Sequence, residues 1–271
     1  MNAERLGKSA ERLMMARVPN EMFVKAVIEA VRLNEEFVPP YETRGALYIR
    51  PFLIGSGVEI GLKPSTEYTF TVFVVPVGDY YKGDKKDKDV LDGVPAMVMD
   101  DFDRASSKGV GFAKVAGNYA AALLPNSIAY AAGCPITLFL DPVNRKFIEE
   151  FNSSNFAGIN KEGIYITPDS PSILKRYFFF FFFFLKKIKH YFNNLKLKIS
   201  VTNNSLIAIA KHLGIKVEVR EIDFEKEIDT FVEVGAVGTA VIITPVNRII
   251  RGKDVHEIGN GTFPVLQKLY K

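Results

Sequence analysis

The first third of the chain repeats its apolar positions with two different periods. Residues 2–15 follow a helical period, and a second helical stretch, residues 21–33, follows Asn20, whose side chain suits a helix N-cap. Two later stretches, 46–54 and 68–77, are rich in β-branched and aromatic residues and are bounded by glycine and proline, which predicts strands. The helix positions expected to face a core are Leu6, Ala10, Leu13, Met14, Phe23, Val24, Val27, Ile28 and Val31.

The first predicted strand carries a polar pair on one face. Alternation along residues 46–54 places Tyr48 and Arg50 together, opposite Leu47 and Ile49. A guanidinium offers two parallel donors, so this pair suits a carboxylate or a phosphate. The alternative is an arginine in an ordinary surface ion pair at a sheet edge.

The middle of the chain reads as a helix followed by a hairpin. We expect a helix over residues 118–132, capped by Asn118, and then strands 136–140 and 146–151 joined by a turn at 141–144. Glu149 and Glu150 are consecutive in the second strand, so their side chains point to opposite sides. At most one of them should therefore point inward, where a buried carboxylate needs a cationic or proton-donating partner.

Two later turns could bind an anion. A helix is predicted over residues 202–214, and its start at Val201 and Thr202 presents free backbone N–H groups to a phosphate; the alternative is an ordinary capped helix. Gly235 and Gly238 free the backbone around Thr239 and Ala240, which form a second turn that could bind an anion. Further elements are expected as strands 217–222 and 241–246 and a helix within 261–271. The mixture predicts an α+β fold.

A single lysine stands in the most glycine-rich stretch. Lys114 follows Gly109 and Gly111, which permit tight turns and close approach of another molecule, and it precedes the helix start at Asn118. The plain alternative is a solvated lysine on a turn.

Composition excludes several classes of function. The 271 residues are 48% hydrophobic and 24% charged, as in globular proteins, and the net charge of +4 is inflated by a lysine-rich segment, so we expect no nucleic-acid partner. One cysteine and three scattered histidines give no support to a zinc site or to a Cys/His or Ser/His mechanism. The charged run 78–91 predicts a solvated linker between two domains.

Residues 175–199 do not fit the surrounding pattern. They hold a phenylalanine run, Phe178–Phe184, which has neither helical nor strand period and is far shorter than the ~20 apolar residues that span a bilayer. We therefore expect no membrane anchor. The segment uses almost only residues whose codons can be built from A and T, so we interpret it as translated noncoding sequence, such as a retained intron, or as a low-complexity insertion.

Six collinear motifs resemble the branched-chain amino-acid aminotransferases, which are class IV, fold-type IV enzymes that use pyridoxal 5'-phosphate. The motifs are Asn2-Ala-Glu-Arg-Leu with Ser9-Ala-Glu-Arg-Leu13, Leu47-Tyr-Ile-Arg-Pro51, Gly111-Phe-Ala-Lys-Val-Ala-Gly-Asn-Tyr119, Ile148-Glu-Glu-Phe-Asn-Ser-Ser-Asn155, Ser200-Val-Thr-Asn-Asn-Ser205 and Gly238-Thr-Ala240. The resemblance implies a small α/β domain, of which residues 1–80 are the remainder, a linker at 81–93 and a larger cofactor-binding domain at 94–271. The larger domain would be a β-rich pseudo-barrel with flanking helices, interrupted at 175–199.

The resemblance also assigns roles to the residues singled out above. Lys114 would hold the cofactor as a Schiff base and later move the proton of the substrate α-carbon, while Tyr119 and Glu150 would bind the 3' oxygen and the pyridine nitrogen. The residues that would hold the phosphate or the substrate carboxylate are Val201, Thr202, Thr239, Ala240, Tyr48 and Arg50.

The implied reaction exchanges the amino group of leucine, isoleucine or valine with 2-oxoglutarate and yields glutamate. A homodimer is implied, with a cytoplasmic location, or a mitochondrial one if a targeting peptide precedes the chain. Two related activities remain as alternatives, D-amino-acid aminotransferase and aminodeoxychorismate lyase, as does an inactive remnant. The chain lacks the family's N-terminal strands and phosphate-binding arginine and part of its last helix, so we expect weak cofactor binding.

Overall fold

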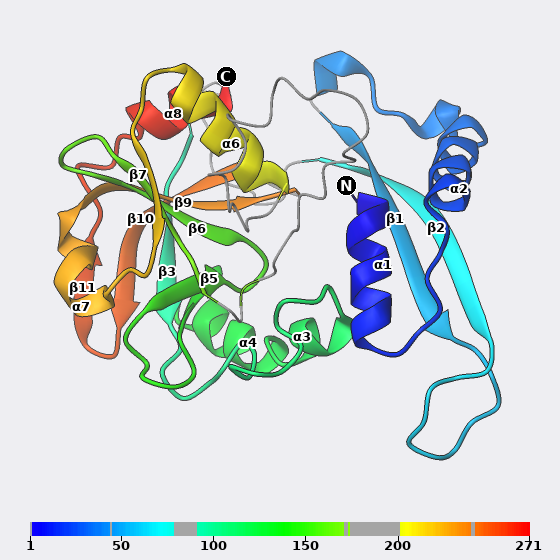
Figure 1. Ribbon diagram of the computed structural model, residues 1–271. Coiled ribbons are helices and arrows are strands. Elements are labelled where there is room, and N and C mark those ends of the chain that lie inside the picture. The colour runs from blue at the N-terminus through cyan, green and yellow to red at the C-terminus, as the bar shows by residue number, and fades with distance from the viewer. Residues whose placement is uncertain (1, 44, 79–90, 171–172, 174–200, 240–241) are drawn as a thin grey trace, which may run out of the picture. The chain divides into compact units, whose positions relative to one another are not determined.

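The computed structural model describes residues 2–43, 45–78, 91–170, 173, 201–239 and 242–271. The chain divides into two compact units, Met1–Lys82 and Gly83–Lys271, and each is described by itself (Figure 1). Most of the predicted linker 81–93 and the whole of the anomalous segment 175–199 lie outside the described residues. The interpretations given to them stay predictions.

The unit Met1–Lys82 is built on one antiparallel strand pair. Its elements are α1 (Asn2–Arg12), α2 (Asn20–Arg32), two 3-10 turns, η1 (Glu35–Phe37) and η2 (Tyr41–Thr43), and strands β1 (Ala46–Gly55) and β2 (Tyr68–Val77). The two strands pair along their full length, from Ala46 opposite Val77 to Gly55 opposite Tyr68. The strand predictions for this region are confirmed.

The helix α2 departs from its prediction in two ways. Asn20 is its first residue and makes no capping hydrogen bond; its side-chain Nδ2 reaches Glu4 instead, at 3.4 Å. Of the five expected core positions only Phe23 is buried, and it stacks on Phe70 of β2 with ring centroids 5.8 Å apart. Val24 and Ile28 are 51% and 58% exposed. The period predicts a helix, but it does not say how much of the apolar face a neighbour covers.

The unit Gly83–Lys271 contains a closed barrel. β10 pairs in parallel with β3, and β3 in parallel with β4. Antiparallel pairs then join β4 to β5, β5 to β6, β6 to β9, and β9 back to β10. Because the last pair returns to the first strand, these six strands form a barrel, and the predicted α+β class is confirmed. The barrel strands are β3 (Val94–Val98), β4 (Ile136–Leu140), β5 (Ile148–Phe151), β6 (Asn155–Asn160), β9 (Phe231–Gly238) and β10 (Ile242–Arg251).

Helices and further strands surround this barrel (Figure 1). The other elements of the unit are α3 (Ala116–Ala120), α4 (Leu123–Ala131), β7 (Tyr165–Pro168), α6 (Val201–His212), β8 (Val217–Arg220), α7 (Phe224–Glu227), η3 (Ile228–Thr230), β11 (Asp254–Glu257) and α8 (Pro264–Tyr270). The single helix expected over 118–132 is therefore two helices, with Pro125 in the first turn of the second, where proline is tolerated. The predicted hairpin of β4 and β5 is confirmed.

The strand β8 pairs in parallel with β7, so α6 is the crossover between them. It ends as predicted at a glycine: Gly214 has φ +76°, and its N–H and that of Ile215 donate to the carbonyls of Lys211 and Ala210. Leu206, Ile207 and Ala210 bury one face of the helix in a core cluster with Tyr165 and α8.

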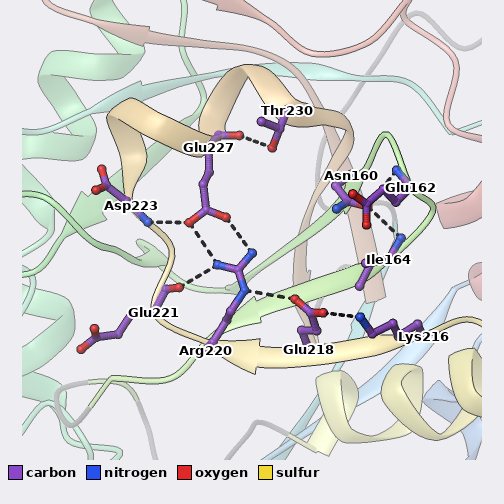
Figure 2. A network of polar contacts seen from close by, with 10 residues as sticks. All are labelled: Asn160, Glu162, Ile164, Lys216, Glu218, Arg220, Glu221, Asp223, Glu227 and Thr230. Carbon is purple, nitrogen blue, oxygen red and sulfur yellow. Dashed lines mark hydrogen bonds and ion pairs between the residues drawn. The ribbon is translucent and has the colours of Figure 1, made fainter.

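An ion network ties β8 to α7 (Figure 2). Arg220 makes a two-pronged contact with the Glu227 carboxylate, at 3.0 and 2.7 Å, and its Nε donates to Glu218 at 3.1 Å. Lys216 completes the row with a 2.8 Å contact to Glu218. Hydrogen bonding to Glu227 raises the pKa of Arg220. Because each charge here has a partner of opposite sign, the network holds structure together and offers no reactive group.

Candidate functional site

Lys114 and Tyr119 form a hydrogen-bonded pair at the surface of the barrel unit. The Lys114 Nζ donates to the Tyr119 hydroxyl at 2.6 Å, and it lies 5.0 Å from the centroid of the same ring. Lys114 is exposed and Tyr119 is 41% exposed, so both can meet another molecule. An amine held against a phenol is suited to nucleophilic attack on a carbonyl and to proton transfer.

Asn118 fixes the loop that carries Lys114, although not in the way that the sequence predicted. It lies inside α3 and caps no helix, because α3 begins at Ala116. Its Nδ2 instead donates to the backbone carbonyls of Val110 and Ala113, at 3.0 and 2.9 Å. The side chain thereby fastens the residues before Lys114 to the helix after it.

Glu150 is the second ionisable group that the sequence singled out, and the barrel buries it. It lies on β5 with 7% exposure. Its Oε1 is 2.9 Å from the Arg104 Nε, and its Oε2 accepts a hydrogen bond from the Asn155 Nδ2 at 3.0 Å. A buried carboxylate is strongly disfavoured without such partners, so these two contacts explain how Glu150 is tolerated inside.

Arg104 was not found by the sequence analysis. It is 6% exposed and lies in the loop between β3 and α3, the same loop that carries Lys114. The ion pair therefore ties the Lys114 loop to the barrel strand β5. The only signal in the sequence is the rule that a buried carboxylate needs a cation, and that rule does not say which of many arginines supplies it.

The sequence analysis expected at most one of Glu149 and Glu150 to point inward, and the structure buries both side chains. Glu149 is 2% exposed and accepts a hydrogen bond from the Ser170 hydroxyl at 2.7 Å. Alternation does send the two carboxylates to opposite sides of β5, but barrel strands with further elements packed outside them have no solvent side.

The strand register brings Glu150 and Thr239 to one end of the barrel. Glu150 is opposite Asn155, and Asn155 is opposite Val237 near the end of β9. Thr239 follows the last residue of β9 and is exposed. A Cβ added to Gly238 would lie 3.4 Å from the Cβ of Ser154, in the turn between β5 and β6. Ala240 lies outside the described residues.

The start of α6 lies at the same end. β7 is antiparallel to β6, so β7 ends at Pro168 where β6 begins. A helix that joins two parallel strands runs back along them, which places its first residues, Val201 and Thr202, beside the end of β7. Topology thus gathers Glu150, Thr239 and this helix start, as the sequence motifs require.

Tyr48 and Arg50 belong to the other unit. They share one face of β1, and the Arg50 guanidinium lies 5.3 Å from the Tyr48 ring centroid and 6.0 Å from that of Phe73. An arginine beside aromatic rings can still offer its N–H groups to a carboxylate. Their joining a site with Lys114 stays a prediction.

The part of the chain that the structure describes offers neither a metal-binding cluster nor a membrane-spanning helix. No cluster of histidine, cysteine and carboxylate side chains there could hold a metal ion. None of the described helices is long and apolar enough to cross a membrane.

No family model matches the chain, but it is similar in sequence and in structure to known proteins. A branched-chain-amino-acid aminotransferase of Helicobacter pylori is 43% identical over 92% of this chain and 64% of its own length. The Haemophilus influenzae enzyme of the same name is 39% identical over 99% and 71%. A crystal structure of the T.th. branched-chain amino acid aminotransferase with pyridoxamine 5'-phosphate matches 98% of this chain and 74% of its own, with a TM-score of 0.73 and 25% identity.

The barrel and its structural match define the class as the fold-type IV enzymes that depend on pyridoxal 5'-phosphate. The residues present fit such a group: an accessible amine beside a phenol, and, at one barrel end, a buried carboxylate and a helix start. Within that class, the chain belongs to the branched-chain amino-acid aminotransferase family. It spans 64% and 71% of the lengths of the two bacterial relatives.

Proposed function

We propose that this protein transfers the amino group of leucine, isoleucine or valine to 2-oxoglutarate, with pyridoxal 5'-phosphate as cofactor. The observation that carries the proposal is the Lys114–Tyr119 pair, on a loop that the Arg104–Glu150 ion pair fastens to the barrel. Family membership supports the reaction class. We also propose a homodimer, on the strength of the family resemblance.

Lys114 is the residue that acts on the reacting atoms. When bound, the cofactor supplies an electrophilic carbonyl and an electron-accepting ring. Lys114 would hold the cofactor through Nζ, and once the substrate amine has displaced it, the Lys114 amine would move the proton of the substrate α-carbon. Tyr119, whose hydroxyl lies 2.6 Å from Nζ, orients the amine, and its own proton would be donated to the 3' oxygen of the cofactor.

Glu150 provides a fixed negative charge for the pyridine nitrogen. The Asn155 Nδ2 donates a hydrogen bond to one oxygen of the carboxylate, and the Arg104 guanidinium lies within ion-pair distance of the other. A carboxylate held in this way would keep a proton on the pyridine nitrogen of the bound cofactor.

Anion binding is assigned to the two turns at the same barrel end. The backbone N–H groups of Val201 and Thr202 at the start of α6, with the Thr239 hydroxyl, bind the phosphate. The amides of Thr239 and Ala240, with Tyr48 and Arg50 on β1, bind the substrate carboxylates. The proposed substrates differ in that leucine carries an apolar side chain and glutamate a second carboxylate, and the Arg50 guanidinium is the group suited to that carboxylate.

Amino transfer from L-leucine to 2-oxoglutarate, followed as glutamate and 4-methyl-2-oxopentanoate formed in equal amounts, tests the proposal. The second candidate functions, D-amino-acid transfer and aminodeoxychorismate cleavage, are separated by offering D-alanine and aminodeoxychorismate in parallel. Preference for either of these over L-leucine would contradict the branched-chain assignment. Sedimentation measurements test the homodimer.

A further inference from the structure

A buried row of hydrogen bonds holds the first turn of α6. The Tyr165 hydroxyl donates to Oδ1 of Asn203 at 2.5 Å, and the Asn203 Nδ2 donates to the Thr167 hydroxyl at 2.9 Å. The Thr167 hydroxyl in turn donates to the backbone carbonyl of Phe156 on β6, at 2.7 Å. Asn203 and Tyr165 are 0% exposed and Thr167 is 1% exposed.

The donors in this row fix the direction of every bond. Burial raises the pKa of Tyr165 far above its ordinary value, so its hydroxyl keeps its proton and donates. The carbonyl of Phe156 can only accept, so Thr167 must donate to it and accept from Asn203. If the Asn203 amide were flipped, its oxygen would face the Thr167 hydroxyl. That hydroxyl already donates its proton to the Phe156 carbonyl, so the flipped amide would lose this hydrogen bond. The amide therefore has one orientation, and so has the helix turn that carries it.

The row of hydrogen bonds fixes the orientation of the first turn of α6, which the apolar face of the helix does not do. Leu206, Ile207 and Ala210 hold the middle of the helix against the core, but apolar contacts are not directional and tolerate small rotations and shifts. Hydrogen bonds weaken steeply when they are bent. Asn203 is the third residue of α6, directly after Val201 and Thr202, so it sets the direction in which their N–H groups point.

We propose that Asn203, held by Tyr165 and Thr167, is a positioning residue that aims the first N–H groups of α6 at the cofactor phosphate. This inference rests on the proposed function, and it assigns a residue that touches neither cofactor nor substrate. A phosphate bound by N–H groups needs donors placed within a few tenths of an ångström, which a helix held by apolar contacts alone does not provide.

The test compares two ligands that differ only at the phosphate. Asn203→Ala and Tyr165→Phe are titrated with pyridoxal 5'-phosphate and with pyridoxal, and binding is followed by the absorbance of the bound ring. We expect the dissociation constant for pyridoxal 5'-phosphate to rise about tenfold, equivalent to ~1.4 kcal/mol, while that for pyridoxal stays within about twofold. Tyr165→Phe removes one oxygen atom and keeps the ring, so it serves even where Asn203→Ala folds poorly.

Asn126→Ala is the matched control. Asn126 lies on α4 and accepts a hydrogen bond from the Thr137 hydroxyl of β4 at 2.7 Å, so it too joins a helix to a strand through a threonine. Asn126→Ala should lower thermal stability without changing the ratio of the dissociation constants for pyridoxal 5'-phosphate and pyridoxal. If Asn203→Ala and Tyr165→Phe weakened the binding of both ligands equally, or weakened neither, Asn203 would only stabilise the fold. Wild-type protein that binds neither ligand would instead refute the proposed function.

Discussion

The strands of the two units differ in how far they are buried. In Gly83–Lys271 the strands close into a barrel, and β4 and β5 are buried along their whole length. In Met1–Lys82 the two ten-residue strands have no third strand beside them among the described residues, and Phe73 and Val75 are each 41% exposed. A closed sheet supplies an interior, whereas an open strand pair supplies a surface.

The same contrast appears in their ion pairs. Arg104 and Glu150 of the barrel unit have side chains only 6% and 9% exposed. Arg17 and Glu4 of the other unit have side chains 37% and 29% exposed. Because water screens the second pair and not the first, charges in the barrel unit are worth more and must be paired.

Replacing Lys114 should give the largest effect and affect chemistry alone. Lys114→Ala removes the amine that attacks and moves the proton, so amino transfer should fall by on the order of 10⁴-fold. Stability should barely change, because the side chain is exposed. The rate of the first half-reaction with L-leucine measures the loss.

Lys108 provides the control for that substitution. It is an exposed lysine of the same loop, and Lys108→Ala should keep the wild-type rate. Similar losses in both variants would mean that the loop needs positive charge in general, and the assignment of Lys114 would then be wrong.

Removing the arginine of each ion pair tests the contrast directly. Arg104→Met leaves Glu150 buried without its cation and should lower the free energy of unfolding by about 3–5 kcal/mol. Arg17→Met disrupts a partly exposed pair and should cost less than about 1 kcal/mol. Urea unfolding of both variants gives the two values.

A double variant separates charge from packing. Arg104→Met with Glu150→Gln removes the stranded charge, so it should recover part of the stability while cofactor binding stays weak. Equal costs for Arg104→Met and Arg17→Met would show that the two units do not differ in the way that burial suggests.

Arg50 tests the role given to the open strand pair. Arg50→Gln keeps a polar side chain on β1 but loses the charge and the forked donor, so KM for 2-oxoglutarate should rise by roughly 10- to 100-fold. KM for L-leucine should rise less, because leucine has no second carboxylate. Arg32→Gln, on α2 of the same unit, is the control, since its guanidinium pairs with Glu29. Equal increases for both substrates would place Arg50 at the shared α-carboxylate instead.

The sequence predicted those parts of the fold that local chemistry decides. Runs of β-branched and aromatic residues bounded by glycine and proline became β1, β2 and the β4–β5 hairpin, and Gly214 ends α6 with the positive φ that glycine adopts readily. The caps assigned to Asn20 and Asn118 were wrong, since each side chain serves a contact with another segment.

The candidate site also contains some residues that the sequence predicted and others that it did not. Lys114 and Tyr119 lie close together in the chain, so a motif captures both. The Arg104–Glu150 pair and the Tyr165–Asn203–Thr167 row join residues far apart in the chain, and only the closed barrel and the crossover of α6 bring them together. A single sequence carries no signal for contacts of that kind.

The smallest expected effect concerns the pH dependence of the barrel unit. Asp141 follows β4, and burial alone would raise its pKa; the backbone amides of Phe147, Asn144 and Lys146 outweigh burial and hold that pKa below its ordinary value. A carboxyl group with a lowered pKa stabilises the fold above its unfolded pKa of about 3.9, and this stability is lost as the pH falls through the folded value. Asp141→Asn should therefore cost about 1–2 kcal/mol at neutral pH and clearly less at an acidic pH below the folded pKa of Asp141. Urea unfolding at both pH values measures this, with Asp101→Asn at an exposed position as control. An equal cost at both pH values would mean that Asp141 acts through the shape of its turn and not through its charge.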